Sequence, residues 1–274
     1  MINVASICMN STKSVSENIA NAFNLIENAV SEGASWVVLP EMFSYMGPYK
    51  DLFKNAESET SENIEKFKAL ALKHKITIFL GTVPEKSSKS SQKVYNTLFV
   101  ISKEGKIISK YRKTHLFNLN GPTTDTSYKE SDGYLPGDKF ETVEIDGLKV
   151  HLSICYDIRF SSMFDCLQRR AKADVIVCPS AFTETTGKRH WHMLMQSRAV
   201  EYQCYVIASS QTGIKENGKE NYGHAIAIDP MGNVLADTKK DEGFVICAIS
   251  KNTISKTRKS LPIIENRRTD LYTK

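Results

Sequence analysis

The sequence has no long hydrophobic run, and this absence argues against a membrane-spanning protein. None of its apolar stretches approaches the length that a helix needs to cross a bilayer. Residues 1–4 lead directly into a strand-like segment, so we expect no secretory signal peptide. We therefore predict a cytoplasmic protein with no membrane partner.

A large excess of one charge is also missing. The formal net charge is +5, and basic residues are interleaved with acidic ones along most of the chain. A nucleic-acid-binding protein normally gathers its basic residues on one face. We therefore expect no nucleic-acid partner, and we interpret the basic segment from about residue 251 as a solvated C-terminal tail.

Patterns that hold metals or disulfides are scarce. None of the six cysteines forms a C-x-x-C pair, and four lie in apolar, strand-like segments, which favours reduced thiols. His190 and His192 are two residues apart on a helical pattern, where side chains at this spacing diverge around the axis. The sequence therefore predicts no metal site and no cofactor.

Three widespread enzyme signatures are absent as well. The sequence contains no G-x-S-x-G motif, no phosphate-binding P-loop and no G-x-G-x-x-G dinucleotide motif. Serine hydrolases, nucleotide hydrolases and dinucleotide-dependent enzymes therefore lose support. No repeat, low-complexity segment or linker divides the chain, so we predict one domain over residues 1–274.

What the sequence does contain is a regular alternation of strands and helices. The first part predicts parallel βαβ units, with segments at 3–9, 19–30, 35–39, 64–71 and 76–80. Two hairpins follow, at 94–101 with 106–110 and at 141–145 with 149–154. The remaining elements are a helix over 191–202 and strands over 174–178, 204–209, 223–228, 234–237 and 243–249. This pattern predicts an α/β fold with two sheets and helices outside them.

Cys155 stands at the most informative position in the chain. Residues 150–154 alternate in hydropathy as a strand does, and residues 161–173 carry a helical pattern. A cysteine between them points its thiol out of a tight turn, where the free N–H groups of the following helix would lower the thiol pKa. Such a thiol is suited to nucleophilic catalysis, although a free cysteine is more often a small core residue.

Two further residues with useful chemistry follow strands in the same way. Glu41 comes after the apolar segment 35–39 and Pro40, and Lys113 comes after the segment 108–111. Open α/β sheets place their ligand sites at the carboxyl ends of strands. Taken singly, Glu41 could cap a turn and Lys113 could be a surface lysine, so neither residue identifies a site by itself.

The segments around these three residues resemble the nitrilase, or carbon–nitrogen hydrolase, superfamily. They are Leu39-Pro40-Glu41, Tyr111-Arg112-Lys113-Thr114-His115-Leu116 and Ile154-Cys155-Tyr156-Asp157-Ile158-Arg159-Phe160. The resemblance continues through Ser180-Ala181-Phe182, Thr186-Gly187, His190-Trp191, Arg198-Ala199-Val200-Glu201, Tyr222-Gly223-His224, Leu261-Pro262 and Arg267-Arg268. It covers nearly the entire chain, and it implies a four-layer αββα sandwich that assembles as a homodimer or higher homo-oligomer.

The resemblance also implies roles for the site residues in hydrolysis of a small amide. Cys155 would attack the carbonyl and form a thioester, while Glu41 would take the thiol proton, pass it to departing ammonia and then activate water. Lys113 and the backbone N–H of Tyr156 would stabilise the oxyanion. Glu130 matches the family's second glutamate, which orients the lysine, although it follows a lengthened loop over 120–126 where a solvated acid is the ordinary interpretation.

We expect the substrate to be a small anionic amide. Because Lys113 is committed to the oxyanion, Arg159 is the candidate for binding a substrate carboxylate with two parallel hydrogen bonds. Thr185 would add a third contact, and Lys188 and Arg189 would bring positive charge to the pocket mouth. Alternatively, Arg159 pairs internally with Asp157 or Glu201, and the two neighbouring basic residues are solvated.

Several activities fit this resemblance. The chain is similar to deaminated glutathione amidases, with omega-amidases acting on 2-oxo acid monoamides and N-carbamoyl or aliphatic amide hydrolases as alternatives. A non-catalytic family member acting as an interaction module is less compatible with an intact Glu41, Lys113 and Cys155. A papain-like peptidase would need a cysteine–histidine pair, and the nearest histidine in sequence, His151, lies on the same strand as Cys155.

Overall fold

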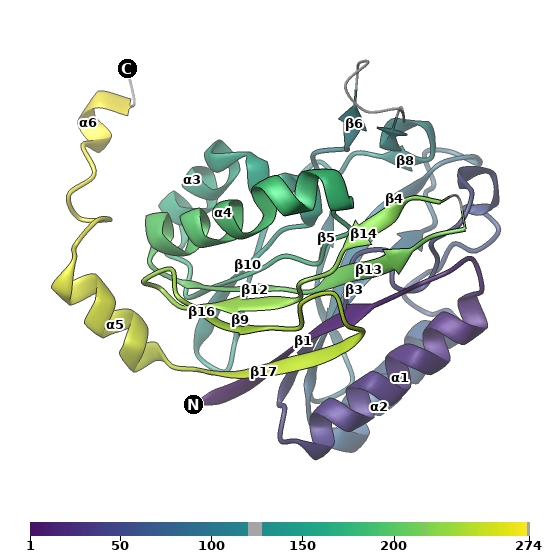
Figure 1. The fold of residues 1–274 in the computed structure, drawn as a ribbon, viewed down its shortest axis with the longest axis horizontal. Helices are drawn as coiled ribbons and strands as arrows, with labels where there is room; N and C mark the ends of the chain where they lie inside the picture. Colours follow the sequence, from purple (N-terminus) through teal and green to yellow (C-terminus); the bar gives the residue numbers. More distant parts are fainter. Residues whose placement is uncertain (120–127, 217, 273–274) are drawn as a thin grey trace.

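Two β-sheets stacked face to face form the centre of the molecule, and helices cover their outer faces (Figure 1). The structure is a computed structural model that describes residues 1–119, 128–216 and 218–272. The predicted α/β class and the αββα layering are confirmed. The lengthened loop expected over 120–126 lies outside the described residues.

The first sheet joins the N-terminal third of the chain to strands from its C-terminal part. Its strands run in the order β14 (Glu220–Tyr222), β13 (Ser210–Ile214), β1 (Ile2–Met9), β2 (Trp36–Val38), β3 (Thr77–Glu85), β4 (Val94–Ile101) and β5 (Ile107–Arg112). Two further strands lie off this path: β17 (Gly243–Ile249) pairs with β1, and β8 (Tyr134–Leu135) pairs with β4. The pairs β1–β2 and β2–β3 are parallel, and β4–β5 is antiparallel. Both the predicted βαβ units and the predicted first hairpin are therefore present.

The second sheet is built from the middle of the chain. Its order is β16 (Val234–Asp237), β15 (Ile226–Ile228), β12 (Tyr205–Ala208), β11 (Val175–Val177), β10 (Leu148–Leu152) and β9 (Glu141–Ile145). The pairs β10–β11 and β11–β12 are parallel, whereas β9–β10 forms the predicted second hairpin. A short separate ladder joins β6 (Asn118–Leu119) to β7 (Tyr128–Lys129).

The helices form the two outer layers and the C-terminal segment. They are α1 (Val15–Ser31), α2 (Glu62–His74), α3 (Ser161–Arg170), α4 (Glu184–Tyr202), α5 (Lys251–Ser260) and α6 (Thr269–Tyr272), together with the 3₁₀ helices η1 (Tyr49–Asp51), η2 (Glu130–Asp132) and η3 (Cys155–Arg159). In Figure 1, α1 and α2 lie on the first sheet and α3 and α4 on the second. Among the helices of the described residues, none is both long and apolar enough to cross a membrane.

Alternation along the central strands explains the layering. In β2, Val37 packs with the helix α1 and α2 side chains, whereas Trp36 and Val38 pack with residues of the second sheet. A strand buried on both faces is expected to be apolar throughout, as these residues are. The indole Nε1–H of Trp36 also donates to Asp146 in the β9–β10 turn at 2.9 Å, which joins the two sheets by a hydrogen bond.

The C-terminal segment is more ordered than the sequence analysis expects. Residues of the expected solvated tail form α5, in which Ile254 and Thr257 are buried. Arg258 pairs with Asp174 at the start of β11 at 3.4 Å, and Arg267 pairs with Asp165 of α3 at 2.7 Å. The buried side chains of Ile254 and Thr257 and these two ion pairs attach the basic segment to the second sheet and its helices.

Candidate active site

Glu41, Lys113 and Cys155 come together at one edge of the sandwich. Glu41 follows β2, Lys113 directly follows β5, and Cys155 begins η3 after β10. Their side chains line one cavity and are buried: Glu41 and Lys113 are each 2% exposed, and Cys155 is 8% exposed. The carboxyl ends of strands from both sheets therefore meet here, as open α/β sheets predict.

Lys113 is held between two carboxylates. Its Nζ lies 2.9 Å from Glu41 Oε1 and 2.8 Å and 3.0 Å from the two oxygens of Glu130. Burial alone would lower the pKa of Lys113, but the Glu130 and Glu41 carboxylates raise it well above its ordinary value. The lysine is therefore a fixed ammonium, and removal of either charge would leave an uncompensated buried partner.

Glu130 is deeply buried, although it lies in the long connection where a solvated acid was the ordinary interpretation. Its side chain is 1% exposed, and its Oε2 accepts the backbone N–H of Phe117 at 2.6 Å. Burial, together with the Glu41 charge, raises the pKa of Glu130 despite the attraction of Lys113. This geometry matches a residue that orients Lys113.

Asn96 links the two glutamates and was missed by the sequence analysis. Its amide Nδ2 donates to Glu41 Oε1 at 2.9 Å and to Glu130 Oε1 at 3.0 Å. Asn96 lies in the fully buried strand β4 among apolar neighbours. A polar amide in such a strand needs a buried partner, so its position in the apolar run 94–101 was the available signal.

The loop that carries Glu41 is fixed on several sides. Gln211 Nε2 donates to the Glu41 carbonyl at 3.0 Å, and the backbone N–H of Met42 donates to Thr82 Oγ1 at 2.7 Å. Gly81 permits the close approach of β3, since a Cβ there would lie 2.2 Å from the Pro40 carbonyl oxygen. The base candidate is therefore held by strands that flank it.

Cys155 occupies a strained turn rather than the N-terminus of a long helix. Its φ is +46°, a left-handed conformation that costs a non-glycine residue about 1–3 kcal/mol. Cys155 is the first residue of the five-residue helix η3, and α3 begins only at Ser161. The expectation that the following helix presents its N–H groups directly at the thiol therefore does not describe this turn.

Asp157 holds the nucleophile turn in place. Its Oδ2 accepts the backbone N–H of Ile154 at 2.9 Å and the hydroxyl of Tyr111 at 2.8 Å, and its Oδ1 lies 2.7 Å from Nδ1 of His115. The side chain of Asp157 is fully buried. From the sequence, Asp157 is expected only as a partner for Arg159; its role in the turn depends on contacts with Tyr111 and His115, which are distant in the chain.

The environment of the Cys155 thiol disfavours its ionised form. Burial and the Glu41 charge raise the pKa of Cys155 well above the ordinary value, and Lys113 offsets only part of this effect. The predicted lowering of the thiol pKa is therefore wrong, because burial and the Glu41 charge outweigh the attraction of Lys113. A base within hydrogen-bonding reach is needed to activate the thiol, and Glu41 is such a group.

The cavity over Cys155 has a volume of about 550 Å³. Aromatic side chains supply much of its wall, namely Tyr45, Tyr49, Phe117, Tyr128 and Tyr134. Charged residues line it farther out, namely Lys129, Lys215, Glu216, Lys219 and Glu220. A small ligand with an apolar body and charged ends fits such a cavity.

A small side cavity next to Cys155 contains two of the three predicted substrate contacts. Tyr156 and Arg159 line it, together with Thr183 and Thr186. Thr185 is exposed and lines neither cavity, whereas Thr183, two residues earlier, lines both. Thr183 is the N-cap of α4, so its side chain faces the site while Thr185 already lies on the outer side of the first turn.

Arg159 does not use either acidic residue considered as its internal partner. Asp157 is engaged in the nucleophile turn, and Glu201 pairs with Arg198 at 2.5 Å. The guanidinium lies 5.0 Å from the ring centre of Phe182 and 5.9 Å from that of Tyr156. Lys188 and Arg189 are exposed and line neither cavity.

A cysteine–histidine pair is not formed by His151. Its Nε2 lies 2.8 Å from the carbonyl oxygen of Ala171, and burial lowers its pKa to about 4. The histidine is therefore a neutral core residue, which removes the proposed basis for a papain-like site.

The family model of the carbon–nitrogen hydrolases matches residues 3–259. The chain belongs to this family. The predicted family and the predicted hydrolase chemistry at C–N bonds are thereby confirmed.

This carbon–nitrogen hydrolase is similar to relatives named as amidases. It is 36% identical over 265 residues to a deaminated glutathione amidase of Synechocystis sp., covering 96% of this chain and 97% of the relative. It is 34% identical over 257 residues to omega-amidase NIT2 of Homo sapiens, covering 94% and 91%. Its structure matches Saccharomyces cerevisiae Nit3, a member of branch 10 of the nitrilase superfamily, with a TM-score of 0.85, 32% identity and coverage of 97% and 96%.

Proposed function

We propose that this carbon–nitrogen hydrolase is an amidase that cleaves small linear amides through a thioester on Cys155. The observation that carries this proposal is the buried Lys113 ammonium, which is held between Glu41 and Glu130 in the cavity that contains the Cys155 thiol. Each of these groups has a distinct task in acyl transfer. The products are ammonia and a carboxylic acid.

In the acylation half of the reaction, Glu41 removes the thiol proton as the sulfur attacks. A new S–C bond converts the amide carbonyl to a tetrahedral oxyanion, which Lys113 and the backbone N–H of Tyr156 stabilise. Protonated Glu41 then gives its proton to the nitrogen, the C–N bond breaks, and ammonia leaves. The raised pKa of the Cys155 thiol favours proton transfer to Glu41 during the attack.

In the deacylation half, Glu41 is again a carboxylate and acts on water. It removes a proton from water as the oxygen attacks the thioester carbonyl, and the same cation stabilises the second oxyanion. The C–S bond breaks, Cys155 recovers its proton from Glu41, and the acid product leaves. Glu130 and Asn96 keep Lys113 and Glu41 in place through both halves.

The proposed substrate carries at least one carboxylate. Arg159 supplies a partly buried cation beside Cys155, with Thr183 near it, and Lys215 and Lys219 add basic groups to the wall of the large cavity. Two similar relatives are named deaminated glutathione amidase and omega-amidase. We propose that the substrate is a 2-oxo dicarboxylic acid monoamide or a short peptide-like acid that bears one. We favour the deaminated glutathione type of substrate, with omega-amidase, N-carbamoyl and aliphatic amide hydrolysis as alternatives.

We also propose a cytoplasmic homodimer, on the family resemblance alone. Light scattering on the purified chain tests this assembly, and a mass equal to one chain would contradict it.

Ammonia release from a matched panel tests the amidase proposal. The panel contains small neutral amides, 2-oxo acid monoamides, a deaminated tripeptide amide and an N-carbamoyl amino acid. We expect turnover of the anionic amides, with kcat/KM above that for neutral amides of the same length. Absence of turnover for every member would contradict amidase activity, whereas preference for the carbamoyl compound would favour that alternative.

A further inference from the structure

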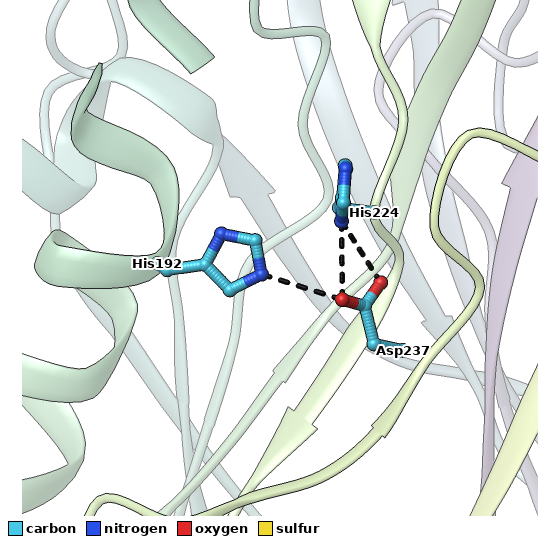
Figure 2. A group of neighbouring side chains, drawn as sticks. All are labelled: His192, His224 and Asp237. Carbon is cyan, nitrogen blue, oxygen red and sulfur yellow. Dashed lines mark hydrogen bonds and ion pairs between the residues drawn. The ribbon is translucent and has the colours of Figure 1, made fainter. Parts of the chain in front are cut away.

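Outside the catalytic cavity, three potential metal ligands from distant parts of the chain point at one another. Figure 2 shows His192 on α4, His224 just before β15 and Asp237 at the end of β16. His192 Nε2 lies 3.4 Å from Asp237 Oδ2, and His224 Nδ1 lies 3.1 Å from both carboxylate oxygens. One ligand atom from each residue lies within 4.8 Å of the others, an arrangement found only here among the described residues.

We propose that His192, His224 and Asp237 form a binding site for a divalent transition-metal ion of the zinc class. Two imidazole nitrogens and one carboxylate oxygen are a donor set that suits zinc and its neighbours, and three protein ligands leave a position for water. None of the three residues lines the cavities at Cys155, so this site is separate from the catalytic centre. The sequence predicts no metal here, because His190 is the only histidine near His192 in the chain, whereas His224 and Asp237 are distant from it.

The backbone holds these ligands in position without an ion. Ile226 of β15 pairs with Asp237 of β16. This pairing places His224, two residues before β15, beside the end of β16. The carbonyl of His224 accepts the indole N–H of Trp191 at 2.9 Å, and Trp191 precedes His192 on α4. An ion would therefore bind with little rearrangement of the chain, a condition that favours affinity.

Contacts around the ligands fix their orientation. The backbone N–H of Lys239 donates to Asp237 Oδ1 at 2.7 Å and orients the carboxylate. The ring of Tyr222 stacks on His224 with centroids 4.3 Å apart, which restricts rotation of that imidazole. Such outer contacts are typical of metal ligands.

The ammonium of Lys239 is the cation that a metal ion bound to Asp237 would displace. Its Nζ lies 2.9 Å from Asp237 Oδ2, and its side chain is 72% exposed. Because the Lys239 ammonium lies at the surface, it returns to solvent when a divalent ion takes its place. The side chain of His192 is 34% exposed, which leaves the site open to ions from solvent.

A metal bound here joins α4 to the β15–β16 hairpin. Because it binds only the folded arrangement, it raises the thermal unfolding temperature in proportion to the logarithm of its concentration above the dissociation constant. The effect is on stability, and the proposal does not depend on the amidase mechanism.

The test uses the untagged full-length chain carrying Cys155→Ala, so that the buried active-site thiol does not compete for metal. After removal of metals with a chelator, Zn²⁺ is titrated calorimetrically and Co²⁺ by visible absorption. We expect one equivalent of either ion and a Co²⁺ spectrum that lacks sulfur-to-metal charge transfer. Absence of binding, or a spectrum with sulfur ligation, would overturn the proposal even if no further variant folds.

Variants in the same background assign the ligands. His192→Ala is expected to weaken Zn²⁺ binding by at least about 10- to 100-fold, because even removal of a residue that only contacts a metal ligand costs this much affinity. The variant should also lose the Zn²⁺-dependent rise in Tm. His74→Ala is the matched control, because His74 lies 3.7 Å from one carboxylate, that of Glu27, and belongs to no three-ligand group among the described residues. It should bind Zn²⁺ as the parent does. Lys239→Ala should bind Zn²⁺ at least as tightly as the parent. Unchanged affinity in His192→Ala, or weaker affinity in Lys239→Ala, would contradict the site.

Discussion

Arg159 Nη1 lies 3.2 Å from Nδ1 of His190, so the guanidinium at the active site contacts a histidine instead of a carboxylate. Burial, and next the charge of Arg159 itself, lower the pKa of His190, which keeps this histidine a neutral acceptor. A neutral partner orients the guanidinium without cancelling its charge. Arg159 thus retains its positive charge beside Cys155, where a substrate carboxylate would be bound.

Replacement of Arg159 by lysine should separate anionic from neutral substrates. Arg159→Lys keeps the charge but loses the planar pair of donors that grips a carboxylate. We expect kcat/KM for anionic amides to fall by about 10- to 100-fold, the value of one charge-assisted hydrogen bond, with neutral amides little affected. Steady-state kinetics on a matched pair of amides measures this, and equal losses for both would make Arg159 a scaffold residue.

Replacement of Cys155 should remove activity while replacement of Cys166 should not. Cys155 lies in the cavity beside Glu41 and Lys113, whereas Cys166 is a partly exposed residue of α3. Cys155→Ala is expected to show no ammonia release above background, and Cys166→Ala to retain the parent kcat/KM. Comparable losses in the two variants would mean that the cysteines act through the fold.

Replacement of Glu41 should slow both halves of the reaction. Glu41→Gln keeps the shape of the side chain and one acceptor but cannot take a proton. General-base removal typically costs about 10²- to 10⁴-fold, so we expect slow thioester formation and slow thioester breakdown. Mass spectrometry of the acyl-enzyme formed from an activated ester, followed over time, measures the second step. Rapid loss of that acyl group would remove Glu41 from deacylation.

Replacement of Asn96 should change the pH profile of the reaction as well as its rate. Asn96→Ala removes a hydrogen-bond donor from both Glu41 and Glu130. Burial already raises the pKa of Glu130, and loss of the Asn96 donor would further disfavour its charged form, so the acidic limb of kcat/KM should move to higher pH. We expect kcat to fall by about tenfold, on the scale of one buried hydrogen bond. A lower rate with an unmoved acidic limb would contradict this positioning role.

His151 should make the fold less stable in acid. Burial lowers its pKa to about 4, compared with about 6.5 in an unfolded chain. The unfolded state therefore binds more protons between these values, and the free energy of unfolding should rise with pH across this window by at most about 3 kcal/mol. Urea unfolding at the two ends of the window measures the slope. His151→Gln should flatten it, and an unchanged slope would assign the acid sensitivity to other groups.

Local patterns in the sequence were sufficient to predict two sheets with helices outside them, and to place Glu41, Lys113 and Cys155 at the ends of strands. Apolar alternation and turn residues depend on neighbours a few positions away, so the strands before Glu41, Lys113 and Cys155 could be predicted. Glu41 and Lys113 also share an edge by a general rule, because β2 and β5 run in the same direction in the first sheet. Cys155 follows β10 of the second sheet, so its place beside them depends on how the two sheets stack. The α5 segment was misjudged because its two buried residues, Ile254 and Thr257, are few among many charges.

Tertiary structure alone decided what surrounds those residues. The pKa of Cys155 depends first on how completely other segments exclude water from the thiol, and next on the charge of Glu41, which is distant in the sequence. Thr183 replaces Thr185 at the cavity because the start of α4 sets which side chain faces inward. His192 meets Asp237 across 45 residues of chain. No local pattern encodes such a meeting, because it is produced by the packing of a helix on a sheet.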